Sequence, residues 1–426
     1  MRPSAAWLVN RSIVFTGVLV FLTAWSAVVP CQILGGVYVR EVGDEGSSTY
    51  ERLIGGDRVS GRLYTDPDVF ERELERIHHR SWMFVGHESE VATPGEFVTR
   101  RMGRQPVLLT RDDTGAVRLW SNRCPHRGAT VCALDQGHTR FFRCPYHAWT
   151  FDNAGALVAL PGEEGFGPTF DRDTHGLAPV PRMETYRGFV FGSWSHEGQT
   201  LTEHLGNARD LIDRVCDISP VGEISLRAGW LRHRIGANWK MAAENVCDFY
   251  HPPITHGSSG LMGGVPPGYF TDAHGGVTRD LGGGHGEVDY RQTEGGSQTG
   301  LGPHGFIFPN LFIEAASIFV IHPVSVSEMT HIQTPITWVG LPEKMQRPQS
   351  RRFAMAFGAA GVIEPDDAAT WERMQLGLQA GEPEWVMLER GLQYDHTGEG
   401  RALDEIAIRG FWRHYRSLMT DEAAAR

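Results

Sequence analysis

The chain has 426 residues, of which 41% are hydrophobic and 21% charged, a balance that excludes disorder and is typical of a globular protein with two or three cores. Forty lysines and arginines against fifty-one acidic residues give a net charge of −11 without any basic run, which excludes nucleic-acid binding. Six cysteines are too few for a disulfide framework and favour a reducing, cytoplasmic location, where clustered Cys and His residues more often bind metal.

Residues 1–53 form an N-terminal extension with an apolar centre. No charged residue lies between Arg11 and Arg40, and the stretch from Ile13 to Val29 is apolar enough for a signal peptide or a membrane-spanning helix. A third interpretation is a misassigned translation start, with the native chain beginning between residues 31 and 54. The lack of a twin-arginine pair and of a small-x-small cleavage site argues against export.

The segment from Asp66 to Trp82 is predicted to be an amphipathic helix, because apolar residues recur at helical intervals and acidic residues occupy its first turn. We expect residues 54–83 to pack on the larger domain that follows later in the chain.

Residues 84–198 predict a small antiparallel β domain. Short strand-like runs alternate with a DDTG turn at 112–115 and a DNAG turn at 152–155, and the run from Gly188 to Trp194 is expected to close the domain. A helix from Gln199 to Cys216 then leads into a second domain.

Residues 199–426 predict that second, larger domain. It begins with a strand-like run from Glu223 to Asn238 and a helix from Asn238 to about Tyr250. Sixteen glycines between residues 257 and 305 then disfavour regular structure and indicate a functional lid or disorder. Strands return after this region, and helical segments alternate from Arg351 to Met419. The predicted fold class is α+β, a small antiparallel β domain followed by an antiparallel sheet with packed helices.

Two turns of the β domain each combine a cysteine with a histidine. Cys124 and His126 form a CxH pair, and Cys144 and His147 form a CxxH pair that begins after seventeen intervening residues. A zinc finger instead places a Cys pair before a His pair. The observed order favours a [2Fe-2S] cluster, with two thiolates on one iron and two imidazoles on the other, over zinc or a chance arrangement. Cys132 lies off this pattern and is expected to be a buried apolar residue.

A second group of metal-binding candidates follows in the larger domain. His251 is expected at the end of a helix that carries Asn245 and Asp248, and the two following prolines should break that helix so that His256 returns from a loop. Two histidines and one distant carboxylate would form an open Fe(II) site. Taken alone, the spacing favours partly buried polar histidines. Three other histidines of the glycine-rich region are expected to be solvated: His274, His285 and His304.

Together the two groups resemble the large (α) subunit of Rieske-type non-haem iron aromatic-ring-hydroxylating oxygenases. The resemblance covers residues 54–418 and rests on the CxH and CxxH pairs and on the run NWKMAAENVCDFYHPPITH, which ends at His256. It implies the helix-grip type of catalytic domain, a Rieske cluster and a mononuclear iron. The N-terminal extension has no counterpart in the family. The implied cluster ligands are Cys124, His126, Cys144 and His147, and the first two iron ligands are His251 and His256.

The resemblance also implies the remaining functional residues. The family's third iron ligand is the second Asp of an acidic pair, which corresponds here to Asp367, beside Asp366, in FGAAGVIEPDDAATWERMQ. In the family's trimers the cluster of one subunit faces the iron of the next. Asp248 is thereby expected to bridge His147 of one chain and His251 of its neighbour, and Asn245 belongs to the same catalytic motif.

The implied activity is that of a terminal oxygenase, most commonly one that forms a cis-dihydrodiol from an aromatic substrate and O2. Because O2 accepts electrons singly and NAD(P)H delivers pairs, a ferredoxin or flavin reductase must supply the cluster, so NAD(P)H acts indirectly. The family further implies a homotrimer of α subunits, with or without a small β subunit. Monooxygenation and O-demethylation use the same scaffold and remain open. A Rieske protein that only transfers electrons would have no use for residues 199–426.

Overall fold

The computed structural model of the chain describes four ranges: residues 48–258, 276–289, 304–314 and 316–420. The chain divides into two compact units, residues 1–44 and 45–426, and all described residues belong to the second. The N-terminal extension therefore lies almost wholly outside the described residues, as does His274. Within the four ranges, no helix is long and apolar enough to cross a membrane.

The segment that precedes the β domain contains the predicted amphipathic helix. Its elements are α1 (Ser48–Leu53), β1 (Arg58–Ser60), α2 (Arg62–Thr65), α3 (Pro67–Glu73) and a π-helical turn (Leu74–His78). The helix begins as expected at Asp66, whose side chain caps it by accepting a hydrogen bond from the N–H of Asp68. The predicted end at Trp82 is wrong, because the helix ends at His78 and the chain turns into strand β2 (Met83–His87), which pairs with β11 (Phe189–Ser193).

A buried ion pair connects this segment to helix α6 (Trp239–Asn245). Lys240 Nζ lies 2.6 Å from Glu73 Oε1, and neither side chain has any exposed surface. The Trp239 Nε1–H and the Tyr415 hydroxyl donate to the same carboxylate at 2.7 and 2.5 Å. Since Tyr415 belongs to α11 (Ile406–Met419), the Glu73 carboxylate ties together three segments that are far apart in the sequence.

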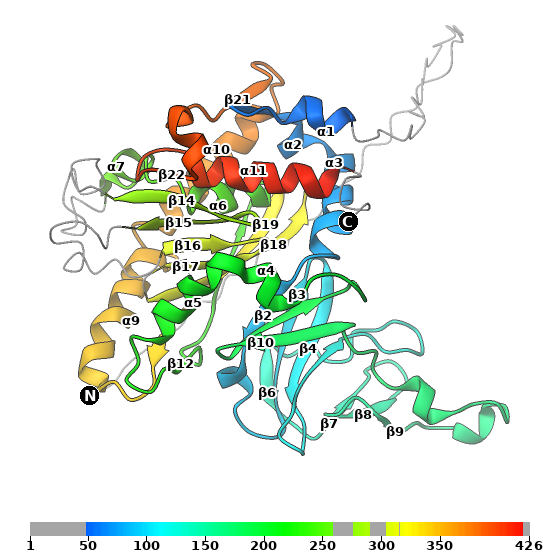
Figure 1. The fold of residues 1–426 in the computed structure, drawn as a ribbon. Helices are drawn as coiled ribbons and strands as arrows, with labels where there is room; N and C mark the ends of the chain where they lie inside the picture. Colours follow the sequence, from blue (N-terminus) through cyan, green and yellow to red (C-terminus); the bar gives the residue numbers. More distant parts are fainter. Residues whose placement is uncertain (1–47, 259–275, 290–303, 315, 421–426) are drawn as a thin grey trace, which may run out of the picture. The chain divides into compact units, whose positions relative to one another are not determined.

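The predicted β domain consists of three antiparallel sheets (Figure 1). Their strand orders are β5-β4-β3-β6, β7-β8-β9 and β10-β11-β2. The DDTG and DNAG turns close at Gly115 and Gly155, which adopt φ of 87° and 82°, a conformation that favours glycine. The strands not yet given are β3 (Glu96–Met102), β4 (Gln105–Arg111), β5 (Val117–Ser121), β6 (Gln136–His138), β7 (Phe141–Arg143), β8 (Thr150–Asp152), β9 (Leu157–Ala159) and β10 (Arg182–Tyr186).

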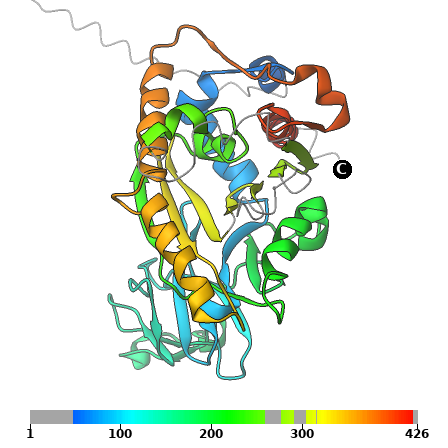
Figure 2. The ribbon, with the colours of Figure 1, turned by 90° about the vertical axis from the view of Figure 1, so that its left-hand side faces the viewer.

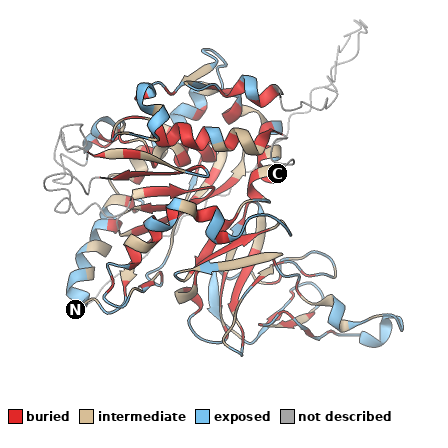
Figure 3. Ribbon diagram, in the orientation of Figure 1, coloured by how far each residue is buried: buried red, intermediate tan, exposed pale blue. Residues whose placement is uncertain are grey.

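The larger domain is built on one antiparallel sheet of eight strands, in the order β13-β19-β18-β17-β16-β15-β14-β22. Helix α11 packs against β14 and β15, α6 against β18, and α9 (Glu343–Phe357) against β19 (Figures 1 and 2). Buried residues concentrate along these strands and α11 (Figure 3). The predicted α+β class is thus confirmed. The strands are β13 (Leu231–Ile235), β14 (Val277–Gly282), β15 (His285–Asp289), β16 (His304–Ile307), β17 (Leu311–Glu314), β18 (Ser317–Ser325), β19 (Glu328–Pro335) and β22 (Glu399–Arg401).

Several local predictions in this domain are wrong. The helix over residues 199–216 is divided into α4 (Leu201–Leu205) and α5 (Arg209–Cys216) by a 3-10 turn at Gly206, where φ is 46°. The run 223–238 forms two strands, β12 (Ile224–Ser225) and β13, because β12 pairs with the distant β20 (Thr337–Trp338). The glycine-rich region contains regular structure, since residues 277–289 form the β14–β15 hairpin, whose turn places glycines 282 to 284 at positive φ.

Candidate metal centres

The two Cys-His turns of the β domain have matching backbones. The Cys124 N–H donates to the Ala129 carbonyl at 2.8 Å, and the Cys144 N–H donates to the Trp149 carbonyl at the same distance. In each turn the residue just before that carbonyl partner, Gly128 or Ala148, has a positive φ. The N–H of this residue donates back to the cysteine carbonyl, so two similar cradles result.

The side chains of these turns separate by type. Both thiols are buried, whereas His147 is exposed and the imidazole rings of His126 and His147 lie together, with centroids 4.5 Å apart. Burial, with the nearby Cys144 thiol, raises the pKa of the Cys124 thiol, and the buried Nδ1 of His126 has no hydrogen-bond partner among the described residues. An inner thiol pair and an outer imidazole pair fit the two irons of a Rieske cluster.

Single-ion zinc fits these four residues less well. A tetrahedral ion needs its donor atoms within a few ångströms of one another. Among the described residues, the group of three or more donors within 4.8 Å of one another lies in the larger domain and includes none of these four.

That group is His251, His256 and Asp367. Asp367 Oδ1 lies 3.4 Å from Nε2 of each histidine. Donors about 2.1 Å from a shared ion, at right angles, are about 3 Å apart, so the spacing suits a metal ion. The other member of the acidic pair, Asp366, accepts a hydrogen bond from Ser258 and approaches His256 only at Nδ1, at 3.9 Å. The geometry therefore favours Asp367 as the ligand.

The backbone that presents the two histidines differs from the prediction. Helix α6 ends at Asn245, not near Tyr250, and irregular turns lead to His251. His251 is the N-cap and His256 the C-cap of a short helix, α7 (Pro252–Thr255). The prolines thus begin a helix, because proline has no N–H to leave unpaired in a first turn. Asp367 comes from the first turn of α10 (Glu364–Leu378).

Burial shifts the pKa of each of the three donors. It raises the pKa of Asp367 to about 7 and, with the nearby His251, lowers the pKa of His256 to about 4. Burial also lowers the pKa of His251, but the Asp248 and Asp367 carboxylates outweigh it, so that pKa is raised. A bound cation would stabilise one carboxylate and two neutral imidazoles together, which fits an Fe(II) site.

The two other predicted catalytic residues contact this group. Asn245 Nδ2 lies 3.3 Å from both Asp367 Oδ1 and His251 Nε2. Asp248 is not on a helix, but its Oδ2 lies 3.8 Å from His251 Nδ1, and its Oδ1 accepts a hydrogen bond from the Tyr250 N–H. Asp248 therefore faces the ring nitrogen of His251 that points away from Asp367.

The expectation that His285 and His304 are solvated is wrong. His285 is buried, with Nε2 2.8 Å from the His204 carbonyl, and it accepts a hydrogen bond from the Phe308 N–H. His304 Nε2 lies 2.7 Å from the Val246 carbonyl. Both belong to strands that the glycine content concealed. Cys132, expected to be buried, is half-buried and packs against the core of the β domain.

Sequence reasoning missed three polar residues near the candidate iron site: Glu314, His331 and Glu364. His331 Nδ1 lies 2.8 Å from Glu364 Oε1, and both side chains are almost fully buried. Glu314 ends the apolar strand LFIE. A charged residue that terminates an apolar strand, or a histidine inside one, is the signal that could have identified them.

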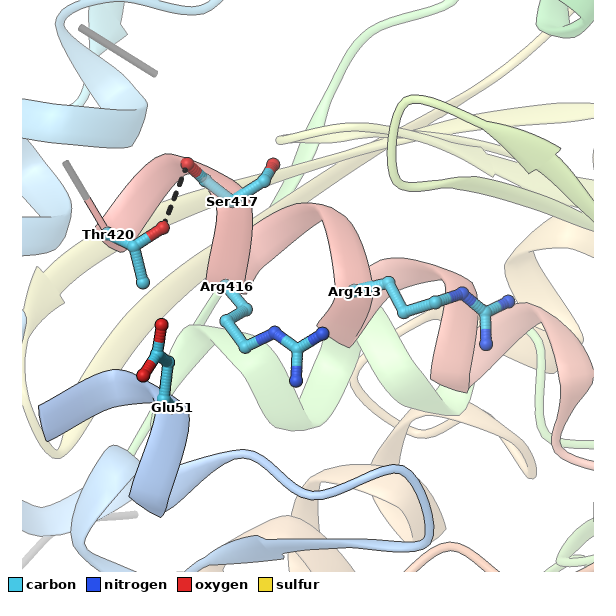
Figure 4. Close-up of a pocket in the computed structure, with 5 residues that line it drawn as sticks. All are labelled: Glu51, Arg413, Arg416, Ser417 and Thr420. Atoms are coloured by element: carbon cyan, nitrogen blue, oxygen red, sulfur yellow. Dashed lines mark hydrogen bonds between the residues drawn. The ribbon is translucent and has the colours of Figure 1, made fainter. Parts of the chain in front are cut away.

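A separate hollow of about 290 Å³ lies between α1 and α11. Figure 4 shows its lining, which consists of Glu51, Arg413, Arg416, Ser417 and Thr420. It contains neither cysteine nor histidine, so it is distinct from both candidate metal centres.

Two protein families match consecutive parts of the chain. Residues 81–180 match the Rieske [2Fe-2S] domain, and residues 221–421 match the catalytic domain of the ring hydroxylating alpha subunit.

Individual relatives extend over most of the chain. It is 31% identical to the biphenyl dioxygenase subunit alpha of Paraburkholderia xenovorans (strain LB400), over 85% of this chain and 91% of the relative. It is 30% identical to the N,N-dimethyl phenylurea N-demethylase subunit alpha of Sphingobium sp. (strain YBL2), over 84% of this chain and 90% of that relative. Among solved structures, naphthalene 1,2-dioxygenase with bound indole superposes with a TM-score of 0.77 at 25% identity, covering 86% of this chain and 93% of that one.

Proposed function

The chain belongs to the family of Rieske-type ring-hydroxylating oxygenase alpha subunits, and from this premise we propose that it is a terminal oxygenase that cis-dihydroxylates an aromatic substrate. The observation that carries the proposal is the convergence of His251, His256 and Asp367 within 4.8 Å. Three protein donors would leave coordination positions open for O2, unlike a closed structural site.

Each candidate centre has its own ligands. Two thiols and two imidazoles would hold the cluster, and the two histidines with Asp367 would hold the iron. When bound, the cluster supplies single-electron transfer and the iron supplies O2 activation. The proposed cluster ligands are Cys124, His126, Cys144 and His147.

The chain's own residues would keep the iron ligands in place. The Asn245 amide donates to Asp367 Oδ1 and so fixes the carboxylate that both histidines face. The Asp248 carboxylate, facing His251 Nδ1, favours the tautomer with the proton on Nδ1 and leaves Nε2 free to bind metal.

We propose a further role for Asp248 between subunits. In a single chain the Asp248 side chain is partly exposed and the cluster residue His147 is exposed, so both could contact a neighbouring subunit. In a homotrimer whose chains meet at these two surfaces, Asp248 would connect His147 of one subunit to His251 of the next. Electrons from NAD(P)H would reach the cluster through a ferredoxin or a flavin reductase.

Product analysis under 18O2 tests the proposed reaction. The chain is supplied with electrons by a surrogate reductase and ferredoxin, and aromatic products are analysed by mass spectrometry. Two labelled oxygens in a reduced ring are expected. One labelled oxygen, or an aldehyde released from an alkyl group, would instead identify a monooxygenase or a dealkylase.

That second activity is the alternative candidate. It is favoured by the 30% identity to the alpha subunit of an N-demethylase. The two reactions need the same metal centres and differ in how the substrate is held, so the ligand set is compatible with both.

A further inference from the structure

The Glu314 carboxylate lies near the candidate iron site, at the end of β17. Within the described residues, the partly buried Glu314 side chain makes neither a hydrogen bond nor an ion pair. Neighbouring carboxylates are satisfied: Asp367 accepts a hydrogen bond from Asn245, and Glu364 pairs with His331.

The sheet register places Glu314 on the iron side of the sheet. Glu314 lies opposite His304 on β16 and Ser317 on β18, and directly opposed residues point to the same face. The His304 ring lies toward the segment that follows α6, because its Nε2 is 2.7 Å from the Val246 carbonyl and its ring contacts Phe249 at 4.6 Å. The Glu314 side chain therefore points toward the segment that carries the iron ligands.

The electrostatic surroundings of Glu314 are acidic. Burial and the carboxylates of Asp367 and Glu364 raise the pKa of Glu314 to about 8. A positively charged or N–H donor placed beside Glu314 would offset this repulsion and keep the carboxylate ionised.

A second acceptor lies on the same face. Gln333 on β19 lies opposite Phe319, which is two residues after Ser317, so Gln333 and Glu314 share a face. Gln333 Oε1 is buried and has no hydrogen-bond partner in the described part of the chain. The face between these acceptors is aromatic, since Phe312 stacks on Phe319 with ring centroids 4.8 Å apart.

We propose that Glu314, assisted by Gln333, is a specificity-determining residue that accepts hydrogen bonds from an N–H group on an aromatic substrate. This inference rests on the proposed oxygenase function and narrows its substrate class to aromatic compounds that carry an amine or amide nitrogen. The aromatic residues of the same face would surround the ring, and the two acceptors match the two or more hydrogens of an amino group.

The test is equilibrium binding by calorimetry to the holoenzyme under nitrogen, with four monosubstituted benzenes of similar size: benzylamine, aniline, phenol and toluene. The wild type should bind the two amines at least tenfold more tightly than toluene. Glu314→Leu should remove this preference without weakening toluene. Glu314→Gln should lose tight binding of cationic benzylamine and retain part of that of aniline. Glu343→Gln, at the exposed start of α9, is the matched control and should change nothing.

Cluster absorbance and the melting temperature verify that each variant is folded, and Glu314→Ala replaces Glu314→Leu if the latter unfolds. Equal or absent binding of all four compounds by the wild type refutes the inference. So does a preference that survives Glu314→Leu, and phenol bound as tightly as aniline refutes the assignment to nitrogen. If amine preference is found but no compound ever gains labelled oxygen, the proposed oxygenase function fails and the binding inference stands.

Discussion

Replacing Lys240 by methionine should destabilise the fold through the carboxylate it leaves behind. Glu73 is fully buried and would keep two donors, Trp239 Nε1 and the Tyr415 hydroxyl, but lose its counter-ion at 2.6 Å. Removing one partner of a buried pair typically costs about 3–5 kcal/mol, because the remaining charge is uncompensated. The two retained hydrogen bonds place our expectation near the lower end, at about 3 kcal/mol.

The assay is urea denaturation at pH 7, followed by circular dichroism, of Lys240→Met, Glu73→Gln and the double variant. The double variant should recover at least half of the loss, because it leaves a neutral amide with the same two donors nearby. Since α6 also carries Asn245, Lys240→Met should further weaken iron retention during dialysis against a chelator. A loss below about 1 kcal/mol for Lys240→Met, or strictly additive single effects, would refute the reasoning.

Four further outcomes are expected. Cys124→Ser should abolish the visible and EPR signals of the cluster while iron still binds the larger domain, and an unchanged spectrum would contradict the ligand assignment. Asp367→Ala should lose mononuclear iron by metal analysis and all turnover, whereas Asp366→Ala should retain both; the reverse result would exchange their roles. Asp248→Asn should keep both metals but slow single-turnover oxidation of the reduced cluster. Mixed trimers of Asp248→Asn and Cys124→Ser chains should regain part of the activity, and no recovery would indicate that electrons pass within one chain. Stability measured by urea denaturation should fall as the pH drops from about 6.5 toward 4. Burial lowers the pKa of His285 to about 4, so over this pH range the histidine takes up a proton only in the unfolded chain. Each such buried histidine should cost up to about 3 kcal/mol of stability, and a flat profile would contradict this.

Local patterns in the sequence predict the elements that depend on neighbouring residues. The cap at Asp66, the turns at Gly115 and Gly155 and the antiparallel strands of the β domain all follow from short-range propensity. The convergence of Asp367 with His256 does not, because nothing in local spacing joins residues of α7 and α10. Only the family resemblance placed it in the site.

The errors have tertiary causes. The sequence pattern predicts a helix that continues through Asp248, so it could not show that α6 ends at Asn245. His285 was expected in solvent because glycines surround it, but pairing with strands before and after it in the sheet buries its ring. The role of Glu314 could not be predicted, because only the sheet register shows which face of the sheet a residue at the end of a strand occupies.

The candidate iron donors lie at the two ends of α7 and in the first turn of α10, so a metal bound there would act as a reversible cross-link. An ion held by His256 and Asp367 closes a loop of about 110 residues, a constraint that the unfolded chain cannot reproduce without the folded geometry. Free iron would therefore raise the free energy of unfolding by mass action. This contribution would grow with the ratio of the iron concentration to its dissociation constant. The supply of iron in the cell would then control how long the catalytic domain persists, as well as whether it turns over.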